Sequence, residues 1–387
     1  MKNNSCRFTH NSFFYNKGNI ANCCAQESLL YKTNWHNVDD LNNFYKTNSA
    51  IADVRSNLDK HIQHPACRTC WLDEKEYGHS MRTNNNYYEV GNAKTSAIDI
   101  THVDLRLSNK CNLQCKMCSP YDSDQLVFLS KKLSSIGIKN PLSAMTPCTD
   151  TADIKKLLKL VVDLPNLQVI RFAGGEPFIM PEVAECLQTL INLNKTDLSI
   201  EFITNCTSAK TTMLDLLKQF KKIEIVCSLD GVGTTIEYQR YPSKWGAIEK
   251  NFNKIYECGF HNLSVSPCIG MLNYLTIDEL FNWVSQYSDI SVGYNEIYEP
   301  SFLNFRYIPL DVRAPFIERF LKIDITNGDP KWQRFKTHTM HEYLEPTQED
   351  CNMLYDYVTT VWDVYGTHKF LDLYPWAEYM LLKAKKL

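Results

Sequence analysis

The sequence predicts an α/β protein, and three observations lead to that fold class. Short runs rich in β-branched residues alternate with amphipathic stretches, from about residue 99 to residue 298. With 44% apolar and 22% charged residues, the chain has the composition of a folded globular protein. Its 387 residues are enough for one large α/β domain with a smaller attachment, or for two to three ordinary domains.

Six runs carry the pattern of strands: 99–107, 167–172, 198–204, 222–228, 263–269 and 290–298. Between them, apolar residues recur at helical spacing within 154–162, 213–220 and 277–284. Repeated strand–helix units predict a parallel sheet with right-handed crossovers, which is either an open doubly wound sheet or a partial barrel. In both architectures the functional residues follow the carboxyl ends of the strands.

The chain divides into three predicted domains. Residues 1–98 are rich in Asn, Cys and His and show little periodicity, so we expect a small Cys-rich domain held by metal. Residues 99–300 contain the strand–helix units. Residues 301–387 read as a helical, aromatic C-terminal extension, with helices predicted at 316–325 and 355–362.

Composition excludes several classes of protein. A net charge of -3, from 41 basic and 44 acidic residues, argues against nucleic-acid binding through bulk charge. No run of 18 apolar residues and no apolar signal-peptide core occur, so we expect a cytoplasmic protein that does not span a membrane. Fifteen cysteines are an odd number and too sparse for a disulfide scaffold, and clustered cysteines in a reducing compartment indicate metal.

The strongest motif follows the first predicted strand. Cys111, Cys115 and Cys118 have the spacing C-x3-C-x2-C on one loop. Three thiolates can hold three corners of an iron–sulfur cube and leave one iron open for another ligand. The alternatives are a structural zinc site that borrows a distant fourth ligand, and ordinary reduced cysteines of the core.

Small or polar residues follow the next three predicted strands: Gly174, Gly175 and Glu176, then Asn205, then Ser228 and Asp230. Paired glycines let the backbone approach a ligand closely, and a carboxylate can bind a cation. Taken singly, each of these motifs is also typical of a turn or a helix cap.

The N-terminal cysteines form a second set. Cys6 and Cys23 stand in the pattern C-x11-G-x4-C around Gly18, and Cys67 and Cys70 form a C-x2-C pair. Four thiolates close an iron–sulfur cluster or a zinc site, and Cys24 could replace Cys23. We expect the polar residues that follow to form a hydrogen-bonded frame around the metal, the alternative being contact with the substrate: Trp71, Glu74, Glu76, Gly78, Ser80 and Arg82.

The motifs C-x3-C-x2-C, GGEP, TN and SLDG occur in the order typical of the radical SAM superfamily, which the chain resembles over residues 99–298. The resemblance implies a partial (β/α)6 barrel of the TIM type. It also implies a [4Fe-4S] cluster on Cys111, Cys115 and Cys118, whose open iron binds the amino and carboxylate groups of S-adenosylmethionine.

The same resemblance implies roles for the other motif residues. Gly174, Gly175 and Glu176 would meet the methionine ammonium, while Asn205 and Ser228 would line the methionine and ribose region, with Asp230 on the same rim. Arg240 is a candidate for the methionine carboxylate, the alternative being a solvated arginine at a helix start.

Two residues depart from the family pattern. Met117 stands where an aromatic residue usually lies near the adenine, a place that a polarizable thioether can fill. Cys206 replaces the usual glycine after Thr-Asn.

The N-terminal cysteine pattern resembles the twitch and SPASM auxiliary-cluster domains of radical SAM enzymes, here placed before the barrel. This implies a second, auxiliary [4Fe-4S] cluster on Cys6, Cys23, Cys67 and Cys70, with zinc as the alternative.

The implied activity is reductive cleavage of S-adenosylmethionine to a 5'-deoxyadenosyl radical, which abstracts hydrogen from a peptide or small-molecule substrate. An electron donor such as flavodoxin or ferredoxin would be a partner, and neither nucleic acid nor a membrane is expected to be one. The alternative is a catalytically inactive metal-cluster or zinc-binding scaffold that serves as an interaction protein.

Overall fold

The computed structural model describes residues 6, 8–26, 38–85, 100–137, 151–324, 331–366 and 368–384. The chain forms two compact units. The first unit comprises residues 1–109, 147–203 and 210–224, and the second comprises 110–146, 204–209 and 225–387. Cys148 and the predicted strand start at residue 99 lie outside the described residues, as does the Glu76 side chain.

A parallel sheet forms the centre of the first unit. Its strands β3 (His102–Arg106), β4 (Val169–Ala173) and β5 (Ser199–Thr204) lie in sequence order, and β6 (Lys222–Cys227) begins beside β5. The pairs β3–β4 and β4–β5 are parallel, with Asp104 opposite Arg171 and Arg171 opposite Glu201. The first four predicted strands are therefore confirmed as neighbours in one sheet, with parallel pairing of the first three.

A hairpin at the N-terminus extends this sheet, which the sequence pattern did not predict. Strand β1 (Ser12–Asn16) pairs antiparallel with β2 (Asn19–Ala21) and parallel with β3. Lys17 and Gly18 form the two-residue turn, with φ of 50° and 93°. A tight hairpin turn of this kind needs positive φ at both central residues, which glycine adopts at no steric cost.

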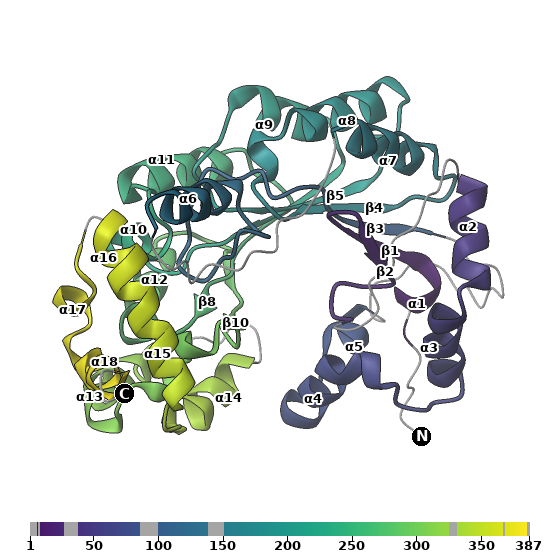
Figure 1. Ribbon diagram of the computed structural model, residues 1–387. Helices are drawn as coiled ribbons and strands as arrows, with labels where there is room; N and C mark the ends of the chain where they lie inside the picture. The colour runs from purple at the N-terminus through teal and green to yellow at the C-terminus, as the bar shows by residue number, and fades with distance from the viewer. Residues whose placement is uncertain are drawn as a thin grey trace. The chain divides into compact units, whose positions relative to one another are not determined.

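Apolar side chains cover one face of the first-unit sheet. Helices α7 (Thr151–Asp163), α8 (Pro181–Asn192) and α9 (Thr211–Leu217) lie along this face (Figure 1). The apolar strand residues that share one face in the register are buried: Val103, Leu105, Ile170, Phe172, Ile200 and Phe202. Because side chains alternate along a strand, the residues between these point to the other face.

A row of charged residues crosses that other face. Asp104, Arg171 and Glu201 are neighbours in the strand register. Arg171 Nη2 lies 2.6 Å from Glu201 Oε2, and Arg171 Nη1 lies 3.8 Å from Asp104 Oδ2. The sheet therefore has one apolar face and one face lined by paired charges.

The strands of the second unit are shorter than predicted. Strand β6 ends in this unit and is followed in the sheet by β7 (Asn262–Val265) and β9 (Ser291–Val292), while β8 (Cys268–Ile269) pairs with β10 (Asn295–Glu296). The predicted strand 263–269 is split at Pro267, which has no N–H to donate to a strand ladder. The predicted strand 290–298 is split at Gly293 and Tyr294.

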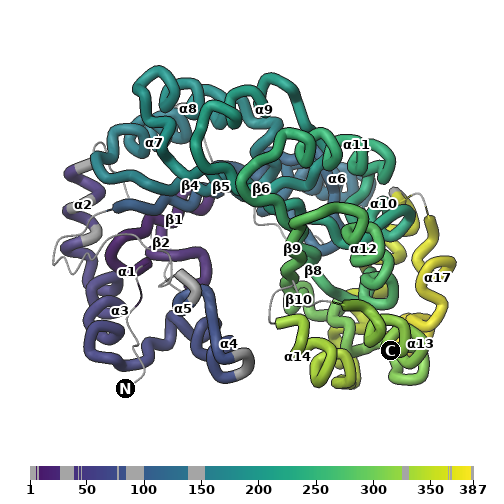
Figure 2. The backbone as a smooth tube through the Cα atoms, turned by 180° about the vertical axis from the view of Figure 1, so that it is seen from behind, coloured from purple at the N-terminus to yellow at the C-terminus, as the bar shows by residue number. Residues whose placement is uncertain are grey.

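The second unit contains ten α-helices among its described residues. They are α6 (Asp124–Ser135), α10 (Gly233–Gln239), α11 (Trp245–Tyr256), α12 (Ile277–Val284), α13 (Leu310–Phe320), α14 (Lys331–Thr337), α15 (Gln348–Tyr357), α16 (Asp363–Tyr365), α17 (Phe370–Leu373) and α18 (Glu378–Ala384). Figure 2 shows α12 beside β8 and β9. A π-helical turn, η7 (Val358–Trp362), continues α15. Helix α13 covers only the first part of the predicted helix 316–325, whereas α15 and η7 together cover the predicted helix 355–362.

The first unit also contains short helices near the N-terminus. They are α1 (Phe8–Asn11), α2 (Val38–Thr47), α3 (Ser49–Asp59), α4 (Arg68–Tyr77) and α5 (Met81–Asn85). Two 3-10 turns lie in the first unit, η1 (Pro65–Cys67) and η2 (Pro177–Ile179). Three more lie in the second unit: η3 (Tyr274–Thr276), η4 (Ser301–Leu303) and η5 (Phe305–Tyr307). Two more lie near the C-terminus: η6 (Thr339–His341) and η8 (Pro375–Ala377). Among the described residues, no helix is both long enough and apolar enough to cross a bilayer.

The hairpin turn yields a test of the N-terminal part of the sheet. Gly18→Ala should lower the free energy of unfolding by about 1–2 kcal/mol, because alanine is strained at positive φ. Gly246 of α11 is the matched control: a methyl group there meets no atom within 4 Å, so Gly246→Ala should be neutral or slightly stabilising. Urea denaturation followed by circular dichroism measures both changes. Equal stabilities of the two variants would contradict the assigned turn.

Candidate functional site

The three-cysteine loop follows β3 and is fixed to the start of α6. The backbone N–H of Cys111 donates to Asp124 Oδ1 at 3.2 Å, and Ser123 Oγ donates to the Leu113 carbonyl at 2.5 Å. Ser123 also caps α6, since its side chain accepts from the Gln125 N–H. The same residues that begin the helix therefore hold the loop.

A second set of backbone bonds joins the loop to the segment after α10. The Gln114 N–H donates to the Tyr241 carbonyl at 2.6 Å, and the Lys116 N–H donates to the Gln239 carbonyl at 2.8 Å. The Cys118 N–H closes a turn on the Cys115 carbonyl at 3.1 Å. With both edges bonded, the loop has a defined conformation at its cysteines.

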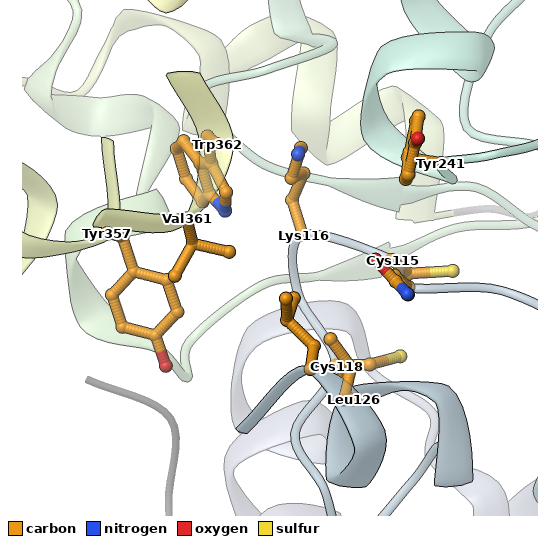
Figure 3. A pocket seen from close by; sticks show the side chains of 10 residues that line it. Cys115, Lys116, Cys118, Leu126, Tyr241, Tyr357, Val361 and Trp362 are labelled. Carbon is orange, nitrogen blue, oxygen red and sulfur yellow. The ribbon is translucent and has the colours of Figure 1, made fainter. Parts of the chain in front are cut away.

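The cysteine side chains of this loop are suited to an iron–sulfur cluster. The sulfur atoms of Cys115 and Cys118 point to the same side of the loop (Figure 3). A hydrogen bond from Cys118 lowers the pKa of Cys115, whereas the same bond and burial raise the pKa of Cys118. No group of three or more Cys, His, Asp or Glu in the described part of the chain is arranged around a single metal ion. Three soft thiolates, with no carboxylate or imidazole among them, match the ligand set of a cluster.

Asn205 lies beside the first cysteine. Its Nδ2 is 3.9 Å from Cys111 Sγ and 3.3 Å from Asn112 Oδ1. Thr207 Oγ1 donates to Asn205 Oδ1 at 2.6 Å and so fixes the orientation of the amide. The structure thus brings Asn205 to the first cysteine of the loop.

Cys206 occupies a left-handed backbone position, with φ of 59°. Glycine adopts this conformation without strain, which accounts for the glycine usual after Thr-Asn in the family that the motifs resemble. The Cys206 side chain is fully buried. The departure from the pattern therefore replaces a relaxed turn by a strained one that is held by packing.

Asp230 and Arg240 form a buried ion pair. Arg240 Nε lies 2.6 Å from Asp230 Oδ2, and Arg240 Nη2 lies 3.1 Å from Asp230 Oδ1. Asp230 is fully buried, and its Oδ1 also accepts from the Cys268 N–H at 2.8 Å. The Asp230 carboxylate raises the pKa of Arg240 well above its usual value, although burial acts in the opposite direction.

The alternative of a solvated arginine at a helix start is wrong. Arg240 is only 7% exposed and lies at the C-terminal end of α10. Asp230 holds its guanidinium against the interior, where electrostatic attraction to Cys115 contributes. Ser228 is half-buried, and its N–H donates to the Thr204 carbonyl at 2.8 Å. Met117 is half-buried on the cysteine loop.

The backbone conformation of the GGEP motif, which lies in the first unit, explains why the motif begins with two glycines. Gly174 and Gly175 have φ of 70° and 60°. A Cβ on Gly174 would lie 2.8 Å from Arg106 Cβ, closer than side chains pack. Glu176 is fully buried, and its Oε1 accepts from the Phe178 N–H at 3.0 Å, which caps η2. The sequence predicts a close backbone approach to a ligand here, whereas the neighbour that Gly174 approaches in the structure is Arg106.

The four N-terminal cysteines of the predicted second set interact with one another. The hairpin brings Cys23 back toward Cys6, while η1 and α4 carry Cys67 and Cys70. The pKa of Cys6 is raised to about 12 by burial, with further contributions from Cys70 and Cys67. The pKa of Cys23 is raised well above its usual value by burial and by Cys6, with a smaller contribution from Cys70. Buried thiols that repel one another as thiolates favour binding of a cation.

Cys24 has a different environment from Cys23. Its Sγ is 3.8 Å from Met81 Sδ, and its electrostatic neighbours are Asp104, Arg171 and Arg106 on the charged face of the sheet. Burial, reinforced by Asp104, raises its pKa to about 11. Of the two adjacent cysteines, Cys23 is the one that interacts with Cys6 and Cys70.

Four of the residues predicted to form a frame after the C-x2-C pair contact one another: Trp71, Glu74, Ser80 and Arg82. Glu74 accepts from Arg82 Nη2 at 2.6 Å, from Arg82 Nε at 2.9 Å and from Ser80 Oγ at 2.7 Å. The Arg82 guanidinium lies 4.7 Å from the centre of the Trp71 ring. Burial raises the pKa of Cys70, and hydrogen bonds from the Arg82 backbone and the Ser80 side chain lower it. Arg82 and Ser80 thus bond both to the Glu74 carboxylate and to Cys70.

One residue of the cysteine loop was missed in the sequence. Lys116 is buried, and burial lowers the pKa of its ammonium to about 8. Its position between Cys115 and Cys118 was the only sequence signal that could have pointed to Lys116. Its surroundings come from residues 238, 241 and 362, which no local pattern connects to the loop.

Comparison with known proteins identifies the middle of the chain. Residues 105–284 match the model of the radical SAM superfamily, so this segment is a radical SAM domain. The match contains the three-cysteine loop, the GGEP motif, Asn205 and the Asp230–Arg240 pair. The sequence matches no curated protein.

Several solved structures are similar to the chain at low identity. SuiB of Streptococcus suis is 13% identical with a TM-score of 0.41, covering 86% of this chain and 66% of that one. SuiB bound to its precursor peptide SuiA gives 13% identity, coverage of 87% and 68%, and a TM-score of 0.40. The protein anSMEcpe with bound AdoMet is 13% identical with a TM-score of 0.36, and the match covers 57% of this chain and 61% of that one. The chain thus spans about three fifths of anSMEcpe.

The buried ion pair yields a test of the site. Arg240→Met should lower the free energy of unfolding by about 3–5 kcal/mol, because it leaves the Asp230 carboxylate buried without a partner. Adding Asp230→Asn removes that charge and should recover part of the loss. Urea denaturation of the wild type, the single variant and the double variant measures this. A double variant no more stable than the single one would contradict the pairing.

Proposed function

We propose that the protein is a radical SAM enzyme, which cleaves S-adenosylmethionine reductively at a [4Fe-4S] cluster. The observation that carries the proposal is the C-x3-C-x2-C loop after β3, inside the segment that matches the superfamily model. Cys111, Cys115 and Cys118 would hold the cluster. When reduced, it would supply the electron that releases methionine and a 5'-deoxyadenosyl radical for hydrogen abstraction from substrate.

Residues around the loop would bind and orient S-adenosylmethionine. Arg240 uses Nε and Nη2 for Asp230, and in the described residues its Nη1 has no hydrogen bond. The guanidinium therefore has a free donor for the methionine carboxylate, with Asp230 as its support. Asn205 and Ser228 would line the methionine and ribose region.

Further contacts to S-adenosylmethionine are proposed for other motif residues. Met117 would pack near the adenine. The Gly174 to Glu176 stretch would meet the methionine ammonium through its backbone, because the Glu176 carboxylate already caps η2. These roles follow from the resemblance of the motifs to the superfamily.

The predicted N-terminal domain, residues 1–98, would hold an auxiliary [4Fe-4S] cluster on Cys6, Cys23, Cys67 and Cys70. Support comes from the mutual interactions of these thiols and from the frame around Cys70. Zinc is the alternative metal, because four thiolates suit it equally well. The cluster would act on the substrate or its radical, or hold the substrate-binding part of the protein.

The two adjacent cysteines provide a matched test of this ligand set. After anaerobic reconstitution, the wild type should hold about eight iron atoms per chain, as two cubane clusters require. Cys23→Ala should lose about half of that iron, whereas Cys24→Ala should keep it, because Cys24 lies against Asp104 and Met81. Iron, sulfide and zinc analyses measure the outcome. Equal loss in both variants, or zinc in place of the iron, would refute the assignment.

We propose a peptide as the substrate, since relatives with auxiliary clusters often modify peptides, and a small metabolite as the second candidate. The electron would come from a carrier such as flavodoxin or ferredoxin in a cytoplasmic setting. The barrel would comprise residues 99–300, and the C-terminal extension 301–387 would cover it.

Formation of 5'-deoxyadenosine separates this enzyme from a metal-stabilised scaffold. Reduced with dithionite, the reconstituted wild type should cleave S-adenosylmethionine slowly without substrate, because the cluster and the bound sulfonium suffice. Cys115→Ala should not. Cys351, buried in α15, is the matched control, and Cys351→Ala should retain cleavage. Chromatography of the nucleoside product measures the rate.

The proposal of an enzyme would be refuted if the wild type, with its iron intact, formed no more 5'-deoxyadenosine than Cys115→Ala. Such a result would favour the scaffold.

A further inference from the structure

Lys116 places a buried positive charge within the cysteine loop. The residue is only 6% exposed. In the described part of the chain no carboxylate lies within ion-pair distance of its ammonium, and Asp363 acts on it only through longer-range electrostatic attraction. A buried lysine without an ion-pair partner is costly, so its surroundings need an explanation.

Three aromatic rings surround the ammonium in place of a carboxylate. The Nζ atom lies 4.9 Å from the centre of the Tyr238 ring, 5.5 Å from Trp362 and 5.7 Å from Tyr241. Figure 3 shows Lys116 between Trp362 and Tyr241. Each distance is within the range of a cation–π interaction. We call Tyr238, Tyr241 and Trp362 the aromatic box.

The aromatic box also limits water. Next to Lys116, a cavity of about 10 Å³ remains, at the lower limit of the space for one water molecule. The cavity is lined by Cys115 and Cys118 on the loop and by Val361 and Trp362 of η7. Because water contributes little screening here, the charge of Lys116 acts over a longer distance than an exposed charge would.

The backbone fixes where this charge lies relative to the cysteines. Lys116 directly follows Cys115, and its N–H donates to the Gln239 carbonyl, next to Tyr238. The ammonium and Cys115 already interact electrostatically in the protein. A cluster with three thiolate ligands is negatively charged and becomes more so when it takes up an electron. A fixed positive charge nearby stabilises the reduced form more than the oxidised form.

We propose that Lys116, held in the aromatic box of Tyr238, Tyr241 and Trp362, is a positioning residue that raises the reduction potential of the cluster on Cys111, Cys115 and Cys118. The inference rests on the proposed function, because it requires that cluster to bind. It assigns η7 a role in the site: Trp362 closes the aromatic box over the cysteine loop.

The test is an anaerobic potentiometric titration of the reconstituted full-length protein, followed by electron paramagnetic resonance. The signal that S-adenosylmethionine perturbs belongs to the cluster with the open iron. In Lys116→Met, which keeps the chain length without the charge, the ratio of reduced to oxidised cluster at the wild-type midpoint should fall about tenfold. That corresponds to about 59 mV for one electron.

Two further lysine variants isolate the charge. Lys116→Arg keeps the positive charge, and its ratio of reduced to oxidised cluster should stay within about threefold of the wild type. Lys110→Met removes an exposed charge from the same loop, and its ratio should change little, because water and salt screen that charge. Trp362→Leu keeps the lysine but admits water, and should lower the ratio by less than Lys116→Met does.

Each outcome decides the proposal. Fully loaded Lys116→Met with the wild-type potential, or Trp362→Leu with no shift, would overturn it. If Lys116→Met binds no iron while Lys116→Arg does, the titration of Trp362→Leu decides: a lowered ratio of reduced to oxidised cluster supports the proposal, and an unchanged ratio overturns it. Loss of iron from both variants would overturn it in favour of a role in shape alone. A wild type without the S-adenosylmethionine-sensitive signal would overturn the proposed function as well.

Discussion

The parallel register of β1, β3, β4 and β5 is the constraint on which the first unit depends. Because side chains alternate along each strand, this register gathers Asp104, Arg171 and Glu201 on one face and the apolar residues on the other. A slip of one residue would exchange the two faces. The pairing of β1 with β3 also fixes the hairpin, and with it the approach of Cys23 to Cys6. The N-terminal thiols therefore depend on the sheet for their arrangement.

Two buried cations of the second unit are stabilised in different ways. Arg240 has a bidentate carboxylate partner, and the pair is nearly neutral as a whole. Lys116 has only the faces of three rings, which lower the cost of burial without cancelling the charge. The first arrangement gives a rigid donor, and the second leaves a net field at the cysteine loop. Both interact electrostatically with Cys115.

The sequence predicted the elements whose pattern is local. Strands β3 to β6 and helix α7 each have a complete apolar pattern within their own residues. Strand β1 was missed because Ser12–Asn16 has four consecutive buried residues and no alternation. Contacts between distant segments were also beyond local reasoning. The Asp230–Arg240 pair depends on how α10 ends, and the surroundings of Lys116 depend on a residue near the C-terminus.

The place of Trp362 in the chain has a consequence for how the protein is made. Residues 119–361 separate the last cysteine of the loop from this ring. During synthesis the N-terminal part leaves the ribosome first. The loop is therefore complete long before the residue that closes over Lys116 exists, and the cysteines stay open on that side throughout translation of the intervening chain. The ring can cover this side of the loop only after residue 362 has been synthesised.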